Sequence, residues 1–132
     1  MCIRDSTSAV ALQTGGFQTL FLDAGPAAAG LPYLVLGSAS GTVPGIALGG
    51  GAVLPLNPDA YLALTLETPQ GPPVWNGLGT FDAAGSALAL IAVPPNLNPG
   101  LAGLTLHHAW AGLPAWPLPP FASNAAPLTL LP

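Results

Sequence analysis

The sequence predicts an all-β fold, an antiparallel and jelly-roll-like β-sandwich of about eight short strands. Glycine and proline, 17 of each in 132 residues, leave no stretch longer than ten residues free of both after residue 14. Both residue types interrupt helices. Apolar and polar side chains alternate within several of these stretches, as they do in strands with one buried face. Turn sequences separate the stretches at short intervals, which is typical of sandwiches.

The expected strands follow one another closely. They cover residues 17–23, 32–37, 46–48 with 52–56, 61–67, 76–81, 86–93, 101–111 and 126–131. Alternation is clearest in the segment 61–67, where Leu62, Leu64 and Leu66 are expected to face the core and Glu67 the solvent. The segment Asp82-Ala83-Ala84-Gly85 has the form of a short hairpin loop, a type I turn that closes on a glycine in the left-handed region.

The chain divides into residues 1–14, expected to be a linker or an artefactual start, and a single β-sandwich domain over residues 15–132. A chain of this length can bury one hydrophobic core, and its Leu, Ile, Val and Phe content exceeds that of disordered chains. The prefix Met1–Ser6 contains the only Met, Cys and Arg of the sequence. It resembles a translated adapter remnant seen in metagenome assemblies. We therefore expect residues 1–14 to pack little and any signal peptide to lie upstream.

The charge balance excludes several classes of partner. Arg4 is the only basic residue against five acidic ones. Nucleic-acid binding needs clustered Lys and Arg to displace counterions, so no nucleic-acid partner is expected. The uncharged segment 31–56 is interrupted throughout by glycine and proline, which argues against a membrane-spanning helix. The single cysteine, Cys2, allows neither a disulfide framework nor a thiolate metal cluster.

Residues typical of a catalytic centre are missing from the sequence. The segment 37–41, GSASG, has alanine where a nucleophile elbow needs serine. A carboxylate pair for glycoside hydrolysis would have to come from Asp23, Asp59, Glu67 and Asp82, yet aspartates in turns normally accept hydrogen bonds from backbone amides. We predict a protein that is not an enzyme and needs no cofactor. A calcium site built on Asp23, Asp59 or Asp82 with loop carbonyls is an open alternative.

The adjacent His107 and His108 are the nearest approach to a metal site. Neighbouring residues of a strand point to opposite faces, so the two rings cannot chelate one ion unless the strand bulges. No further metal ligand is near in sequence, and we expect no metal site. Leu104, Leu106 and Trp110 share a face with His108, which should be buried with a backbone or hydroxyl partner. His107 should be open to solvent.

Trp75 and Trp116 are candidate ligand-stacking residues. With Trp110, Tyr33 and Tyr61 they could form a platform for a sugar ring, because an aromatic face offers apolar area with a polar rim. The other interpretation of these side chains is that they anchor the core or loops. A carbohydrate-binding module that uses exposed aromatics is therefore the alternative function.

Three segments carry a family resemblance: LDAGPAAAGLPYLVLGSASGTVPGIALGGGAVLPLNPDAYLALTL (22–66), GTFDAAGSALALIAVPPNLNPGLAGLTLHHAWA (79–111) and FASNAAPLTLLP (121–132). They resemble a C-terminal module repeated across secreted or surface proteins of planctomycete-type bacteria. The resemblance covers nearly the whole chain from about residue 13. In that family the module typically follows a propeller-like or other repeat region and ends the polypeptide. The resemblance implies an extracellular or cell-surface location, with upstream domains of the same polypeptide as partners, and it implies no catalytic residue.

Together these observations predict a non-catalytic C-terminal module of a larger exported or cell-surface bacterial protein. Its expected role is structural, attachment or sorting, and a glycan or a cell-envelope component is a further candidate partner. Segment 113–120, LPAWPLPP, is less polar than the hairpin expected between the last two strands.

Overall fold

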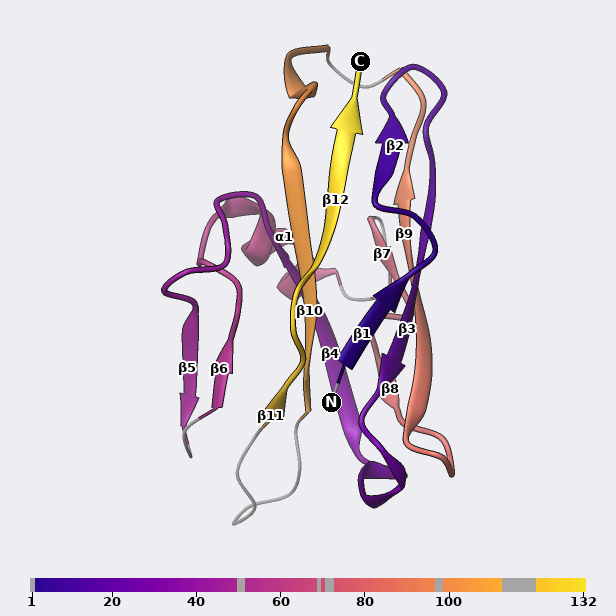
Figure 1. Cartoon of the computed structure of the whole chain (residues 1–132), viewed down its shortest axis with the longest axis vertical. Helices are drawn as coiled ribbons and strands as arrows, with labels where there is room; N and C mark the ends of the chain where they lie inside the picture. The colour runs from indigo at the N-terminus through magenta and orange to yellow at the C-terminus, as the bar shows by residue number, and fades with distance from the viewer. Residues whose placement is uncertain (1, 50–51, 69, 71–72, 97–98, 113–120) are drawn as a thin grey trace.

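Two β-sheets packed face to face form most of the computed structural model (Figure 1), which describes residues 2–49, 52–68, 70, 73–96, 99–112 and 121–132. Strands make up 49% of it and helix 12%, which confirms the predicted all-β sandwich. The strand pairs are antiparallel, apart from a parallel pair between β2 and β12.

Each sheet combines strands that are distant in sequence. Sheet A has the order β1 (Cys2–Asp5), β3 (Gly16–Asp23), β9 (Ser86–Val93) and β7 (Val74–Trp75). Sheet B has the order β2 (Ala9–Ala11), β12 (Ala126–Leu131), β10 (Thr105–Gly112), β4 (Pro32–Ser38) and β8 (Leu78–Thr80), with β11 (Phe121–Ala122) also paired to β10. The remaining elements are the hairpin of β5 (Ile46–Gly49) and β6 (Ala52–Leu54), helix α1 (Ala60–Glu67), and the 3-10 turns η1 (Pro26–Ala28) and η2 (Pro99–Leu101).

The main core lies between the two sheets. Alternation along each strand sends every second side chain inward, and on β3 these are Leu20 and Leu22, both fully buried. Trp110 lies at the centre and contacts the rings of Phe81 and Phe121 edge to face. The other fully buried core side chains include Tyr33, Val35, Val74, Ile91 and Leu128.

A second, smaller core covers the outer face of sheet B. It consists of Leu36, Leu54, Leu56, Ala109 and Ala111. The hairpin β5–β6 and the segment after it bring Leu54 and Leu56 to this face. Strand β10 is therefore buried on both faces, which its alternating pattern did not predict.

The segment expected to be the strand 61–67 is a helix, so this prediction was wrong. Asp59 caps the helix: its carboxylate accepts a hydrogen bond from Leu62 N at 2.8 Å. Leu64 and Leu66 are 43% and 53% exposed, not buried, although Glu67 is exposed as expected. The alternating leucines suited a strand, but Ala, Leu and Glu favour a helix once a cap begins it.

The segment expected to be a linker, residues 1–14, contributes strands to both sheets. Strand β1 pairs with β3, and β2 pairs with β12. Ile3, Val10 and Leu12 are buried in or beside the main core. The buried Gln18 amide donates to Thr7 O at 2.7 Å and to Pro127 O at 3.1 Å. The segment therefore packs, because its alternating apolar residues supply core side chains.

The predicted turn at residues 82–85, closing on a left-handed glycine, is confirmed, but it is not the hairpin loop that the sequence predicted. Gly85 has a φ of 77° and its N–H donates to Asp82 O at 3.0 Å. The strands that it joins, β8 and β9, belong to different sheets, so the turn carries the chain across the sandwich. Among the described residues, no helix has the length and apolarity needed to cross a membrane.

Candidate functional site

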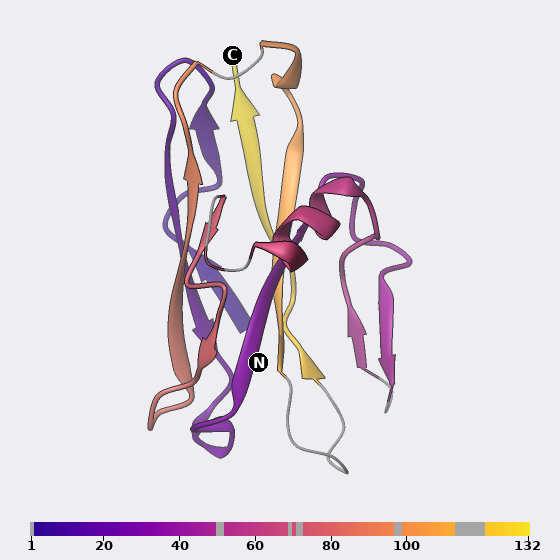
Figure 2. The same cartoon turned by 180° about the vertical axis from the view of Figure 1, so that it is seen from behind.

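A polar cluster lies where α1 meets β4 and β10. Helix α1 lies beside the end of β4 (Figure 2), beyond the residues of β4 that pair with β8. The cluster has two parts. The Asp59 network comprises Asp59, Ser38 and Ser40, and the Tyr61–His108 pair links α1 to β10.

The Asp59 carboxylate accepts four hydrogen bonds. One oxygen accepts from Leu62 N at 2.8 Å, and the other accepts from Ser40 Oγ at 2.8 Å, Ala39 N at 2.8 Å and Ser38 Oγ at 3.1 Å. Burial would raise the pKa of Asp59, but these hydrogen bonds to the charged form together hold the pKa below its usual value. The carboxylate therefore fixes the start of α1 to the end of β4.

Tyr61 and His108 form a neutral pair. Tyr61 Oη lies 2.7 Å from His108 Nε2, and the two rings meet edge to face at 5.5 Å. Burial lowers the pKa of His108 to about 3, with a smaller contribution from His107. Burial also raises the pKa of Tyr61, and the charge of Asp59 adds to that rise. Both groups are uncharged at neutral pH.

Gly37 makes room for this pair. A Cβ atom at residue 37 would lie 2.8 Å from Cδ2 of His108 and would also collide with the Tyr61 ring. The Gly37 N–H, on the edge of β4, donates to Thr65 Oγ1 at 3.1 Å, and the Thr65 hydroxyl donates to Leu62 O at 2.9 Å. A side chain of α1 thus takes the place of the neighbouring strand that β4 lacks there.

The polar groups of the cluster are engaged with one another in ways that hold the fold together. The serine hydroxyls donate to Asp59, while the His108 ring bonds to Tyr61. No hydrogen bond joins Ser38 or Ser40 to His108 in the described part of the chain, so a serine–imidazole pair of the kind that activates a nucleophile is not formed here. The arrangement is suited to attaching α1 to sheet B.

The histidine predictions were right in part. His108 is fully buried on the same face as Leu106 and Trp110, and its partner is a hydroxyl as expected. His107 is half-buried, and its Nδ1 is buried with no hydrogen-bond partner among the described residues, so the prediction that it is open to solvent was wrong. The outer face of β10 is enclosed by the second core, which the local sequence could not indicate.

The predicted acidic residues do not gather in one place. Asp23 accepts a hydrogen bond from Gly25 N at 3.1 Å, and Asp82 accepts from Ala84 N and Ser86 N at 2.9 Å. Each satisfies its own turn, as expected of aspartates at such positions. Among the described residues no group of three or more His, Cys, Asp or Glu is arranged to hold a metal ion.

The predicted aromatic platform is not formed by all five side chains. Tyr33 and Trp110 are buried in the main core, where Tyr33 Oη donates to Asn76 O at 3.0 Å. Tyr61 is bound to His108, and Trp116 lies outside the described residues. Trp75 on β7 is 44% exposed, and its role in ligand stacking stays a prediction.

Trp75 belongs to an apolar surface that sequence reasoning missed. We call this surface the outer face of sheet A: Arg4, Phe17, Thr19, Phe21, Trp75, Leu88, Leu90 and Ala92. Strand pairing places them in rows, with Trp75 beside Leu90 and Leu88 beside Phe21. Phe17 is 65% exposed, Leu88 54% and Phe21 38%. The signal in the sequence was that β3 and β9 carry apolar residues at outward as well as inward positions.

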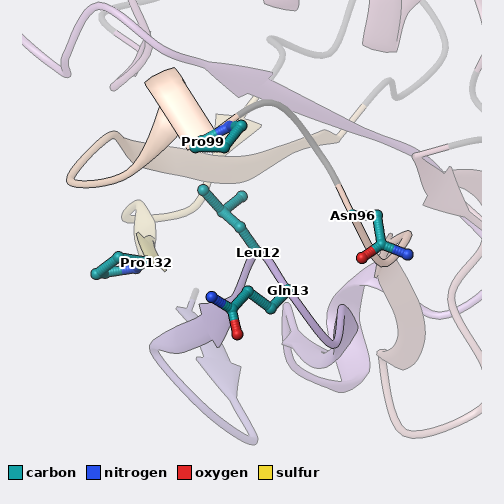
Figure 3. A pocket seen from close by; sticks show the side chains of 5 residues that line it. All are labelled: Leu12, Gln13, Asn96, Pro99 and Pro132. Atoms are coloured by element: carbon teal, nitrogen blue, oxygen red, sulfur yellow. The ribbon is translucent and has the colours of Figure 1, made fainter.

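Two hollows also open among the described residues. One, of about 300 Å³, is bordered by Leu12, Gln13, Asn96, Pro99 and Pro132, which come from separate segments of the chain (Figure 3). The other has a volume of about 630 Å³ and lies between α1 and the two sheets. The described residues that line it are almost wholly apolar.

Comparison of this chain with protein-family models, with curated proteins and with solved structures gives no match in any of the three.

Proposed function

We propose that this domain is a non-catalytic β-sandwich module of a larger exported or cell-surface bacterial protein, and that it attaches through the outer face of sheet A. The observation that carries the proposal is the set of large apolar side chains that this face leaves in water: Phe17, Phe21, Trp75 and Leu88. Contiguous exposed apolar surfaces of this kind mark interaction sites. The polar clusters of the domain support a structural rather than a chemical role, because their hydrogen bonds hold turns and α1 in place.

The expected occupant of this face is an upstream domain of the same polypeptide. Strand β1 is an edge strand of sheet A, so a chain that precedes it would leave beside the apolar rows. Arg4 on β1 lies over the Phe21 ring, 5.8 Å from its centre, at that border. The module's location at the end of an exported protein rests on the family resemblance.

Hydroxyl-radical footprinting tests this proposal. Oxidation of Phe17, Phe21 and Trp75 would be compared between the isolated domain and a longer protein that includes the upstream sequence, with the buried Trp110 as internal control. We expect the three exposed side chains to be oxidised less in the longer protein, while Trp110 stays protected in both. Equal oxidation in the two proteins would refute attachment through this face.

Carbohydrate binding is the second candidate, and the position of Trp75 favours it. Trp75 and Phe21 lie on one open sheet face, and such aromatic surfaces can stack on sugar rings. A glycan array with the isolated domain, followed by affinity measurement on Trp75→Ala, tests this function. Val53→Ala is the matched control, because Val53 is 52% exposed on the separate hairpin β5–β6. Binding that survives Trp75→Ala would reject Trp75 as the stacking residue, and Trp116 would be substituted next.

A further inference from the structure

The 630 Å³ hollow opens between α1 and the ends of the two sheets. Its walls come from α1 (Tyr61 and Leu64), β9 (Ile91), β10 (Leu106) and β12 (Leu130), with loop residues completing them. Its volume lies in the range of about 300–1,000 Å³ that is common for small-molecule sites. Ile91, Leu106 and Leu130 are buried and form its inner wall, whereas Leu64 is 43% exposed. Ala92, a member of the outer face of sheet A, also lines this hollow.

The chemistry of the walls limits what this cavity can hold. Among the described residues that line it, none is charged and Tyr61 carries the only polar side-chain atom. The hollow is open to solvent, and a carboxylate or ammonium group held against its walls would lose hydration there without gaining a partner of opposite charge. A peptide would bury amide groups that the walls cannot satisfy. An uncharged, mainly hydrocarbon molecule meets neither penalty.

The Tyr61–His108 pair offers one hydrogen bond to such a molecule. His108 is fully buried, its Nε2 lies 2.7 Å from Tyr61 Oη, and its Nδ1 has no partner in the described part of the chain. Buried N–H donors are seldom left unpaired, so we assign the imidazole proton to Nε2, which donates it to the tyrosine oxygen. The tyrosine O–H is then available to donate to a ligand acceptor.

We propose that this cavity binds one neutral, chain-like molecule with a carbonyl oxygen near one end, of the class of fatty acyl esters. The hydrocarbon chain lies against the leucine and isoleucine wall, and the ester carbonyl accepts the Tyr61 hydrogen bond. Burial of each methylene group supplies the affinity, and the single hydroxyl sets the orientation.

Solution NMR with methyl-labelled leucine tests this assignment on the intact chain. Methyl decanoate is the probe. The decanoate anion, measured above neutral pH, is the matched comparison, because it has the same hydrocarbon chain but a charged carboxylate in place of the ester. We expect methyl decanoate to shift the Leu106 and Leu130 resonances saturably, and decanoate to bind more weakly by about tenfold or more. Tyr61→Phe should weaken ester binding by about threefold to tenfold, the loss of one hydrogen bond.

Variants on α1 locate the bound probe. Leu64→Trp fills the cavity and should weaken ester binding by about tenfold or more, as loss of several buried methylene contacts implies. Leu66→Trp is the matched control, since Leu66 is 53% exposed on the same helix and does not line the cavity. If Leu64→Trp fails to fold, Ala60→Phe places bulk at another lining position. The assignment is overturned if methyl decanoate gives no saturable shift, if decanoate binds as tightly, or if the Leu64 and Leu66 variants respond alike.

Discussion

Replacing Gly37 by alanine tests the close contact that α1 makes with sheet B over this residue. The new Cβ would lie 2.8 Å from Cδ2 and 3.0 Å from Nε2 of His108, and it would also collide with the Tyr61 ring. Overpacking of this kind costs about 1–3 kcal/mol. Displacement of Tyr61 would leave the buried imidazole without its partner, which adds about 1–3 kcal/mol. The lower chain entropy of alanine in the unfolded state offsets about 0.4–1 kcal/mol.

The net expectation for Gly37→Ala is a loss of about 2–4 kcal/mol in the free energy of unfolding. Urea denaturation followed by circular dichroism measures it, and the melting temperature should fall by about 8–16 °C in a chain of this size. The double variant with Tyr61→Ala removes the collision with the Tyr61 ring, although not the close contact with His108. Its loss should therefore be smaller than the sum of the two single losses by about 1 kcal/mol or more. A loss below about 0.5 kcal/mol for Gly37→Ala, or strict additivity, would show that Tyr61 does not lie over Gly37.

Three other perturbations give expected outcomes. Deletion of residues 1–6 removes β1 and the buried Ile3, so urea denaturation should show a loss of about 2 kcal/mol or more; an unchanged midpoint would mean that β1 adds nothing. The folded-state pKa of His108, about 3, lies below its unfolded value. The stability that the neutral His108 contributes is therefore fully present above the unfolded pKa and is lost as the pH falls towards 3. The free energy of unfolding should fall by up to about 1.4 kcal/mol per pH unit in this range. Denaturation at a series of pH values should show this slope, and His108→Gln should lose it whereas His107→Gln should keep it. Asp59→Ala removes the cap of α1 and three further hydrogen bonds, and it should lower the unfolding free energy by about 2 kcal/mol. Unchanged helix content in the far-ultraviolet circular dichroism spectrum, together with an unchanged denaturation midpoint, would contradict the capping role.

The sequence by itself determined the fold class and most of the long strands. Strands β9 and β12 begin and end where predicted, and β3 differs by one residue. Local physics suffices for these elements, because glycine and proline limit each segment and alternation marks its inward face. The turn at residues 82–85 and the burial of His108 follow from the same local rules.

Tertiary contacts decided the state of residues 60–67. Three alternating leucines among alanine and threonine are compatible with a strand as well as a helix. The helix is favoured by the Asp59 cap, by the space above Gly37, and by Thr65 accepting the hydrogen bond that the edge of β4 offers. Thr65 and Gly37 are 28 residues apart in sequence, so no short window of sequence contains both.

Only the tertiary structure decided which sheet faces are covered. The outward residues of β10, such as Ala109, are buried because the hairpin β5–β6 packs over them. The outward residues of β3 and β9, such as Phe17 and Leu88, are exposed because no described element covers the outer side of sheet A. Both sheets are apolar on their outer sides, and hydrophobicity specifies only that a side chain favours burial. Which segment buries it depends on the path of the chain in space. For that reason the exposed apolar face of sheet A and the hollow beside α1 emerged from the structure and not from the sequence pattern.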